Sequence, residues 1–106
     1  MSILFVETYL VDPANEAKVL DFHRRLRALF DAHPEKFNGA KTWQVYRQSI
    51  GVTWRFIELI EFESLADLDA YFAGFSTDEE LTAVVKEFYS LIDAASHTTE
   101  IWTPAL

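Results

Sequence analysis

The segment RFIELIEF, residues 55–62, constrains the fold more than any other part of the sequence. Its β-branched and aromatic residues favour an extended strand, in which successive side chains point to opposite faces. Alternation puts apolar side chains on both faces: Trp54, Phe56, Ile60 and Phe62 on one, Ile57 and Leu59 on the other. Both faces therefore need cover, and Glu58 stands among the aromatic residues of the first.

Residues 3–11 have the same two-sided character. One face carries Ile3, Phe5, Glu7, Tyr9 and Val11, and the other carries Leu4, Val6, Thr8 and Leu10. A second glutamate, Glu7, therefore lies in the middle of an otherwise apolar strand face.

Periodicity and turn signals predict the remaining elements. Strands are expected at 3–11, 41–48, 52–62 and 97–103, and a first helix at about 14–33. A second helix opens at Ser64 as N-cap and reaches about residue 73, where Gly74 is expected to break it. A further helical piece follows, capped by Ser76 with Glu79 or by Thr77 with Glu80, and presents its apolar face from Leu81 to Ile92.

The order strand, helix, strand, strand, helix, strand predicts an α+β fold, the ferredoxin-like βαββαβ sandwich, in a single domain over residues 1–106. Its antiparallel sheet has both helices on one face. The strands at 3–11 and 52–62 are expected to lie side by side in the sheet centre, and we expect them to be parallel. The sheet face away from the helices would leave a large apolar patch in a monomer, so we expect a homodimer with the two sheets packed together.

Charge and composition exclude several classes of protein. The net charge of −8 repels phosphate backbones and anionic lipid, so nucleic acid and membrane are not expected partners. The chain has no cysteine, which rules out disulfides, zinc-thiolate sites and thiol nucleophiles. The start MSILFVETYLVD has no basic leader and no apolar run reaches membrane-spanning length, so a cytoplasmic location is expected.

Three segments carry a resemblance to a known superfamily: ETYLVDP at residues 7–13, IEFESLADLDAY at 60–71 and HTTEIW at 97–102. With them the chain resembles the dimeric α+β barrel proteins, in particular the antibiotic-biosynthesis-monooxygenase and NIPSNAP-like branches. The resemblance spans nearly the whole chain and implies two sheets closing a barrel across a dimer. It also implies a ligand cavity in each subunit, between the sheet and the helices.

The resemblance also suggests which positions face that cavity. Glu7 falls where heme-degrading members have an asparagine. Ile60 and Tyr71 fall where monooxygenase-type members often have a glutamate and a helical histidine, and Glu58 lies one pleat before Ile60 on the same face. The absence of both the asparagine and the histidine argues against heme degradation.

Glu7, Glu58 and His23 are the candidate catalytic residues. Neighbouring buried carboxylates raise each other's pKa, which suits a general acid or base, although structural carboxylates bonded to Arg, Tyr or Trp are the alternative. His23 lies in the apolar arc of the first helix and could serve as a base or a metal ligand, or simply be a core histidine. His97, at the start of an edge strand, is expected at the surface.

A ligand pocket is predicted from aromatic residues and a second helical histidine: Tyr9, Trp54, Phe56, Tyr71 and His33. A core or interface role is the alternative for each aromatic residue, and an interaction with the helix dipole is the alternative for His33. The spacing of the histidines matches no helical chelate, and neither a metal nor a cofactor is expected.

Two functions remain open from the sequence. The first is a cofactor-free oxygenase or isomerase that acts on a small hydrophobic or aromatic substrate. The second is a non-catalytic dimer that binds a hydrophobic ligand or serves as an interaction module. A cavity containing Glu7 and Glu58 would favour the first, and a core filled with side chains would favour the second.

Overall fold

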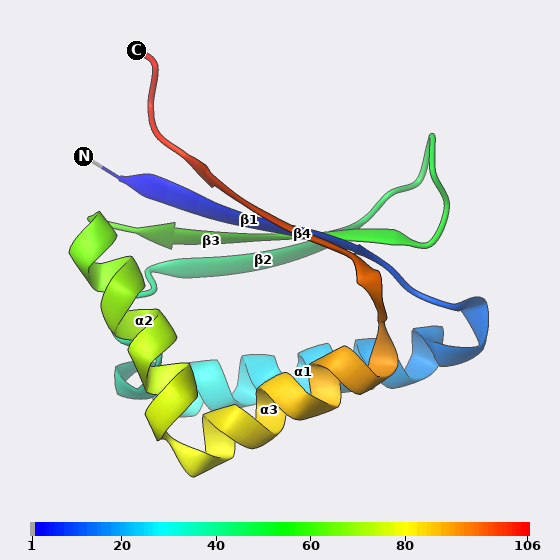
Figure 1. Cartoon of the computed structure of the whole chain (residues 1–106), viewed down its shortest axis with the longest axis horizontal. Coiled ribbons are helices and arrows are strands. Elements are labelled where there is room, and N and C mark those ends of the chain that lie inside the picture. The colour runs from blue at the N-terminus through cyan, green and yellow to red at the C-terminus, as the bar shows by residue number, and fades with distance from the viewer. Residues whose placement is uncertain (1) are drawn as a thin grey trace.

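A twisted four-stranded sheet is covered on one face by three helices (Figure 1). This computed structural model describes residues 2–106. The strands are β1 (Ile3–Leu10), β2 (Thr42–Arg47), β3 (Arg55–Phe62) and β4 (Asp93–Trp102). The helices are α1 (Glu16–Ala32), α2 (Leu65–Thr77) and α3 (Glu79–Leu91), with short 3₁₀ turns at Pro13–Asn15 and Pro34–Phe37. No helix in residues 2–106 is both long and apolar enough to cross a bilayer.

The strand order β2-β3-β1-β4, with every neighbouring pair antiparallel, confirms the predicted ferredoxin-like α+β fold. The expectation that β1 and β3 are parallel is wrong. The crossover through α1 makes β1 and β2 parallel, and β3 returns from β2 as a hairpin into the gap between them. The pairing of β1 with β3 sets Glu7 directly opposite Glu58.

The alternation expected for the central strands is confirmed. The helix-facing side chains are buried: Ile3, Phe5 and Tyr9 from β1, and Phe56, Ile60 and Phe62 from β3. They form two apolar clusters under the helices, and α2 and α3 add Leu68 and Leu81, which are 2% and 0% exposed. Burial of these side chains is the main term that stabilises the sheet against the helices.

The expected helix break at Gly74 is wrong, because α2 continues through this glycine to Thr77. Gly74 serves close packing instead, since a Cβ at this position would lie 2.5 Å from Asn38 Nδ2. The Ser64 cap on α2 is confirmed, with the Asp67 N–H donating to Ser64 Oγ at 3.3 Å. The cap of α3 is neither Ser76 nor Thr77.

Asp78 separates the two helices. Its extended backbone ends α2, and its Oδ1 accepts from the Glu80 and Leu81 N–H groups at 2.9 and 3.1 Å. Ser76 and Thr77 instead donate to carbonyls one turn back in α2. A carboxylate accepts these free N–H groups better than a hydroxyl because it also interacts favourably with the helix dipole.

Replacing Asp78 by alanine is expected to lower the free energy of unfolding by about 1 kcal/mol, because two N–H groups at the start of α3 lose their acceptor. Urea unfolding followed by circular dichroism measures the loss. Glu79→Ala is the matched control, since it removes one negative charge from the same turn without removing a capping bond. Equal losses in the two variants would show that charge, and not the cap, stabilises this helix end.

Candidate functional site

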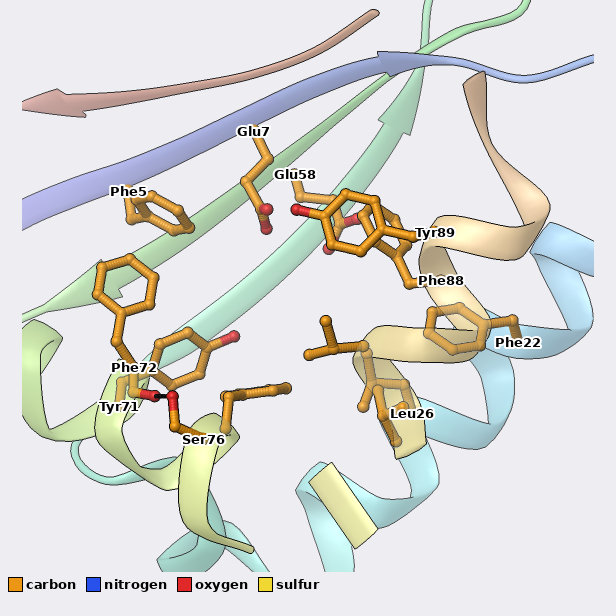
Figure 2. Close-up of a pocket in the computed structure, with 13 residues that line it drawn as sticks. Phe5, Glu7, Phe22, Leu26, Glu58, Tyr71, Phe72, Ser76, Phe88 and Tyr89 are labelled. Atoms are coloured by element: carbon orange, nitrogen blue, oxygen red, sulfur yellow. Dashed lines mark hydrogen bonds between the residues drawn. The ribbon is translucent and has the colours of Figure 1, made fainter. Parts of the chain in front are cut away.

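A cavity of about 310 Å³ lies between the sheet, α2 and α3 (Figure 2). Its walls are mainly aromatic and aliphatic: Phe5, Phe22, Tyr71, Phe72, Phe75, Phe88, Tyr89, Leu26, Val84 and Val85, with Ser76 among them. Phe72 and Tyr89 are 43% and 42% exposed and therefore lie at its mouth. Glu7 and Glu58 are the charged residues that line it.

Glu58 is buried at 4% exposure and bonded through both carboxylate oxygens. Tyr9 O–H donates to Oε2 at 2.7 Å, and Trp43 Nε1–H donates to Oε1 at 2.8 Å. Burial, and then the negative charge of Glu7, raise the pKa of Glu58 to about 7, against the lowering effect of the two hydrogen bonds. Glu58 is thus a carboxyl group that gains and loses a proton near neutral pH.

His23 stands behind Tyr9 and does not line the cavity. Its Nε2 lies 2.8 Å from the Tyr9 oxygen. Because Tyr9 gives its proton to Glu58, this nitrogen must be the donor, which leaves Nδ1 a buried acceptor without a partner in residues 2–106. Burial lowers the pKa of His23 to about 4, so the ring is neutral at physiological pH. His23 holds Tyr9 in place for Glu58.

Glu7 belongs to a second chain of hydrogen bonds, on the β4 side of the cavity. Its Oε1 lies 2.9 Å from His97 Nε2, and His97 Nδ1 lies 3.1 Å from the Tyr89 hydroxyl. The expectation that His97 is a surface residue is wrong, because its side chain is only 12% exposed. The β1–β4 register shifts between Thr8 and Leu10, where Ser96 Oγ accepts the Leu10 N–H at 2.8 Å. No pattern in the sequence marks this irregularity.

The structure separates the residues expected to bind ligand. Tyr71 lines the cavity and points its hydroxyl into it (Figure 2). Tyr9 and Phe56 lie behind the lining, stacked on each other with their ring centroids 5.9 Å apart. Trp54 precedes β3 with a left-handed φ of 65° and is not among the lining residues.

His33 lies outside the site. It ends α1 at the surface, where its Nδ1 lies 3.3 Å from Glu35 Oε1. The helix periodicity predicted His33 on the inward arc, but α1 ends at Ala32. The backbone of His33 is not helical, because the residue before a proline avoids the helical region.

The helices supply most of the cavity wall, and apart from Tyr71 these residues were not predicted from the sequence as part of a site. Phe22, Phe72 and Phe88 come from α1, α2 and α3 in turn. Their spacing is that of any core-facing helix, so their only signal is the unusual number of aromatic residues. In residues 2–106, no three His, Asp or Glu side chains gather in a metal-ligating arrangement.

Comparison with known proteins defines the class to which this fold belongs. No protein-family model matches the sequence, and none of the curated proteins matches it significantly. Among solved structures, a NIPSNAP family protein from Agrobacterium tumefaciens aligns with a TM-score of 0.78 at 17% identity, covering 99% of this chain and 94% of that one. A putative antibiotic biosynthesis monooxygenase from Caulobacter crescentus aligns with a TM-score of 0.76 at 20% identity, covering 99% and 91%.

A second Agrobacterium tumefaciens NIPSNAP family protein, described as having unknown function, aligns with a TM-score of 0.74 at 15% identity over 98% of this chain and 88% of that one. At these identities the likeness shows the fold. The protein therefore has the ferredoxin-like α+β fold of the NIPSNAP and antibiotic-biosynthesis-monooxygenase structures, as the sequence resemblance implied.

Proposed function

We propose that the cavity binds a small, largely apolar molecule and that Glu58 removes a proton from it without a cofactor. The observation that carries this proposal is the Glu58 carboxyl group in the wall of an aromatic cavity, with a pKa raised to about 7. A general base is most effective when its pKa is near the working pH. A carboxylate with an ordinary pKa would be a weak base for a carbon acid or a phenol.

The neighbouring groups have separate roles in the proposed reaction. Tyr9 and Trp43 orient the Glu58 carboxylate through hydrogen bonds, and the aromatic walls exclude water. Glu7, bonded to His97, places a negative charge opposite Glu58 that increases its basicity. The Tyr71 hydroxyl, which points into the cavity, is placed to donate a hydrogen bond to the anion that forms.

Two reactions can follow from such an anion. Return of the proton to another atom of the same molecule makes the protein an isomerase. Reaction of the electron-rich anion with dioxygen makes it a cofactor-free oxygenase, and the Caulobacter crescentus structure is named a putative antibiotic biosynthesis monooxygenase. Both begin with the same proton removal, so this step is the one to test.

Exchange of acidic C–H protons in D₂O tests the step without knowledge of the natural substrate. The wild type is expected to accelerate loss of the C–H signal in the NMR spectrum of at least one member of a panel of cyclic diketones and hydroxylated bicyclic ketones. Glu58→Gln is expected to lower that rate at least about 100-fold, the usual effect of removing a general base. Glu35→Gln, the same charge change at a side chain that is 70% exposed, is the control and is expected to exchange like the wild type.

The alternative function is ligand binding without turnover, for which the same cavity suffices. In that case panel compounds raise the melting temperature of the protein but the wild type accelerates no exchange. Equal exchange by the wild type and Glu58→Gln would also reject Glu58 as the base.

The sheet face away from the helices supports the proposal of a homodimer. It presents the partly exposed side chains of Leu4, Leu10, Ile57 and Leu59, together with Tyr46 and Trp102, which are 52% and 58% exposed, whereas Val6 on this face is buried. Figure 1 shows that no helix of residues 2–106 covers this face. Burying the same apolar surface of a second copy removes both patches from water at once. Sedimentation at micromolar concentration is expected to give twice the 12.2 kDa chain mass.

A further inference from the structure

We propose that the cavity between the sheet, α2 and α3 selects organic cations, and that its ligand is an amine attached to an aromatic body. The inference shares with the proposed function only the premise that the cavity takes a ligand. It adds the charge of that ligand, which follows from the groups that line the cavity.

The lining of the cavity is acidic. Glu7 and Glu58 face each other across the β1–β3 pair, and no lysine or arginine is among the lining residues. Arg25 contacts the ring of Phe22, with its guanidinium carbon 5.8 Å from the ring centroid. It is bonded to Asp21 and Glu87, so its charge is already matched at the surface. A ligand carboxylate or phosphate would therefore meet two acids and no cation.

The walls of the cavity are mainly aromatic. Seven aromatic rings line the space in front of the two acids: Phe5, Phe22, Tyr71, Phe72, Phe75, Phe88 and Tyr89. The faces of such rings carry partial negative charge and attract ammonium groups, an attraction that grows where water is excluded. Aromatic rings combined with carboxylates are a recurrent means of recognising organic cations.

The two acids also repel each other. Burial and the charge of Glu7 both oppose ionisation of Glu58. An ammonium group between the two carboxylates would relieve the repulsion and donate hydrogen bonds to both. His97 offsets the charge of Glu7 only where it is protonated, and it holds one oxygen of that carboxylate. The other Glu7 oxygen has no bond to His97 and is available to the ligand.

Three compounds that share one ring system test the selectivity: tryptamine, tryptophol and indoleacetate, which end in an ammonium, a hydroxyl and a carboxylate. Isothermal titration calorimetry of the wild type at neutral pH is expected to show tryptamine binding at least about 10-fold more tightly than tryptophol, equivalent to one 1.4 kcal/mol step. Indoleacetate is expected to bind more weakly than tryptophol.

Variants at the two acids connect the preference to the cavity. Glu58→Gln and Glu7→Gln are each expected to reduce the ratio of tryptamine to tryptophol affinity, and to leave tryptophol affinity within about 3-fold of the wild type, because only the charged partner is lost. Glu35→Gln, in the exposed 3₁₀ turn after α1, is expected to leave the ratio unchanged. Circular dichroism confirms that each variant is folded before titration.

Several outcomes would overturn the inference: tryptophol or indoleacetate binding as tightly as tryptamine, no binding by any of the three, or a tryptamine preference that survives in both acid variants. These outcomes are independent of the deuterium-exchange result, which uses neutral carbon acids. Exchange without amine selectivity would retain Glu58 as a base and reject the cationic ligand. Amine selectivity without exchange would retain the ligand class and reject the proton transfer.

Discussion

The free energy of unfolding of Glu58→Gln minus that of the wild type is expected to be about 2–3 kcal/mol larger at pH 8 than at pH 5. The buried carboxyl group has a pKa of about 7, well above its ordinary value of 4.5. Between pH 4.5 and about pH 7, Glu58 therefore keeps its proton in the folded protein but has lost it in the unfolded chain. Wild-type stability from this group is fully present below pH 4.5 and is lost as the pH rises through 7.

His23 has the opposite effect over an overlapping range. Its pKa falls from 6.5 to about 4, so its contribution to stability is present above pH 6.5 and is lost as the pH falls towards 4. The total stability of the wild type is therefore a poor measure of Glu58. Comparison of the two chains at each pH cancels His23, because both chains contain it.

Glutamine can occupy this position because the hydrogen-bond chain can reverse. Its amide oxygen can accept from Trp43 Nε1–H, and its NH₂ group can donate to the Tyr9 oxygen. Tyr9 O–H then donates to His23 Nε2, and the imidazole proton moves to Nδ1, the nitrogen without a partner in residues 2–106. All these groups remain uncharged, so no buried charge is left without a partner.

Urea unfolding of both proteins at pH 5, 6, 7 and 8, at one fixed protein concentration, measures the difference. A difference that stays constant with pH would show that Glu58 titrates in its ordinary range. That result would remove the main support for Glu58 as a base. Glu35→Gln is expected to follow the wild type at every pH.

Leu59→Glu is expected to convert the proposed dimer into a folded monomer at micromolar concentration. Leu59 lies on β3, paired with Val6 and Gln44, on the sheet face away from the helices. A symmetric interface places the new charge at two positions at once, and burying an unpaired carboxylate costs several kcal/mol. The dissociation constant is therefore expected to rise by at least about 1,000-fold, equivalent to about 4 kcal/mol.

The core should survive this change, because Leu59 points away from the two clusters under the helices. Sedimentation velocity gives the mass, and circular dichroism gives the helix content. Ala17→Glu adds the same charge on the exposed surface of α1 and is expected to remain dimeric. A wild type that sediments as a stable monomer would reject the sheet-to-sheet interface, as would a Leu59→Glu variant that stays dimeric.

Alternation and turn signals were sufficient to predict the fold from the sequence. Side chains alternate between the two faces of β1 and β3, and apolar residues occur on both faces. This pattern predicted strands in the sheet centre that need cover on both faces. The same alternation put each of Glu7 and Glu58 on one face of its strand, and the resemblance to the dimeric α+β barrel proteins suggested that these faces point to the cavity, where the structure has them. Strand alternation and turn signals are local, so the residues themselves determine them.

The location of the break between α2 and α3 needed more than local signals. Gly74 disfavours a helix by propensity, yet it lies inside α2, where the Asn38 side chain packs closely against it. Asp78 competes as a cap with two nearby hydroxyl residues, and the sequence offers all three at similar spacing. The choice depends on where α3 must start in order to pack Leu81 into the core.

The sequence by itself determined the ferredoxin-like arrangement and which side chains share a strand face with each glutamate, because strand period and helix period act over a few residues. Only the tertiary structure decided that β1 and β3 run antiparallel, that His97 reaches Glu7 across the β1–β4 irregularity, and that His23 supports Tyr9 from behind. The pKa of Glu58 depends on the same contacts, since burial and the opposing charge come from segments about fifty residues apart. Contacts between distant segments leave no periodic trace in the chain, and these contacts form the candidate site.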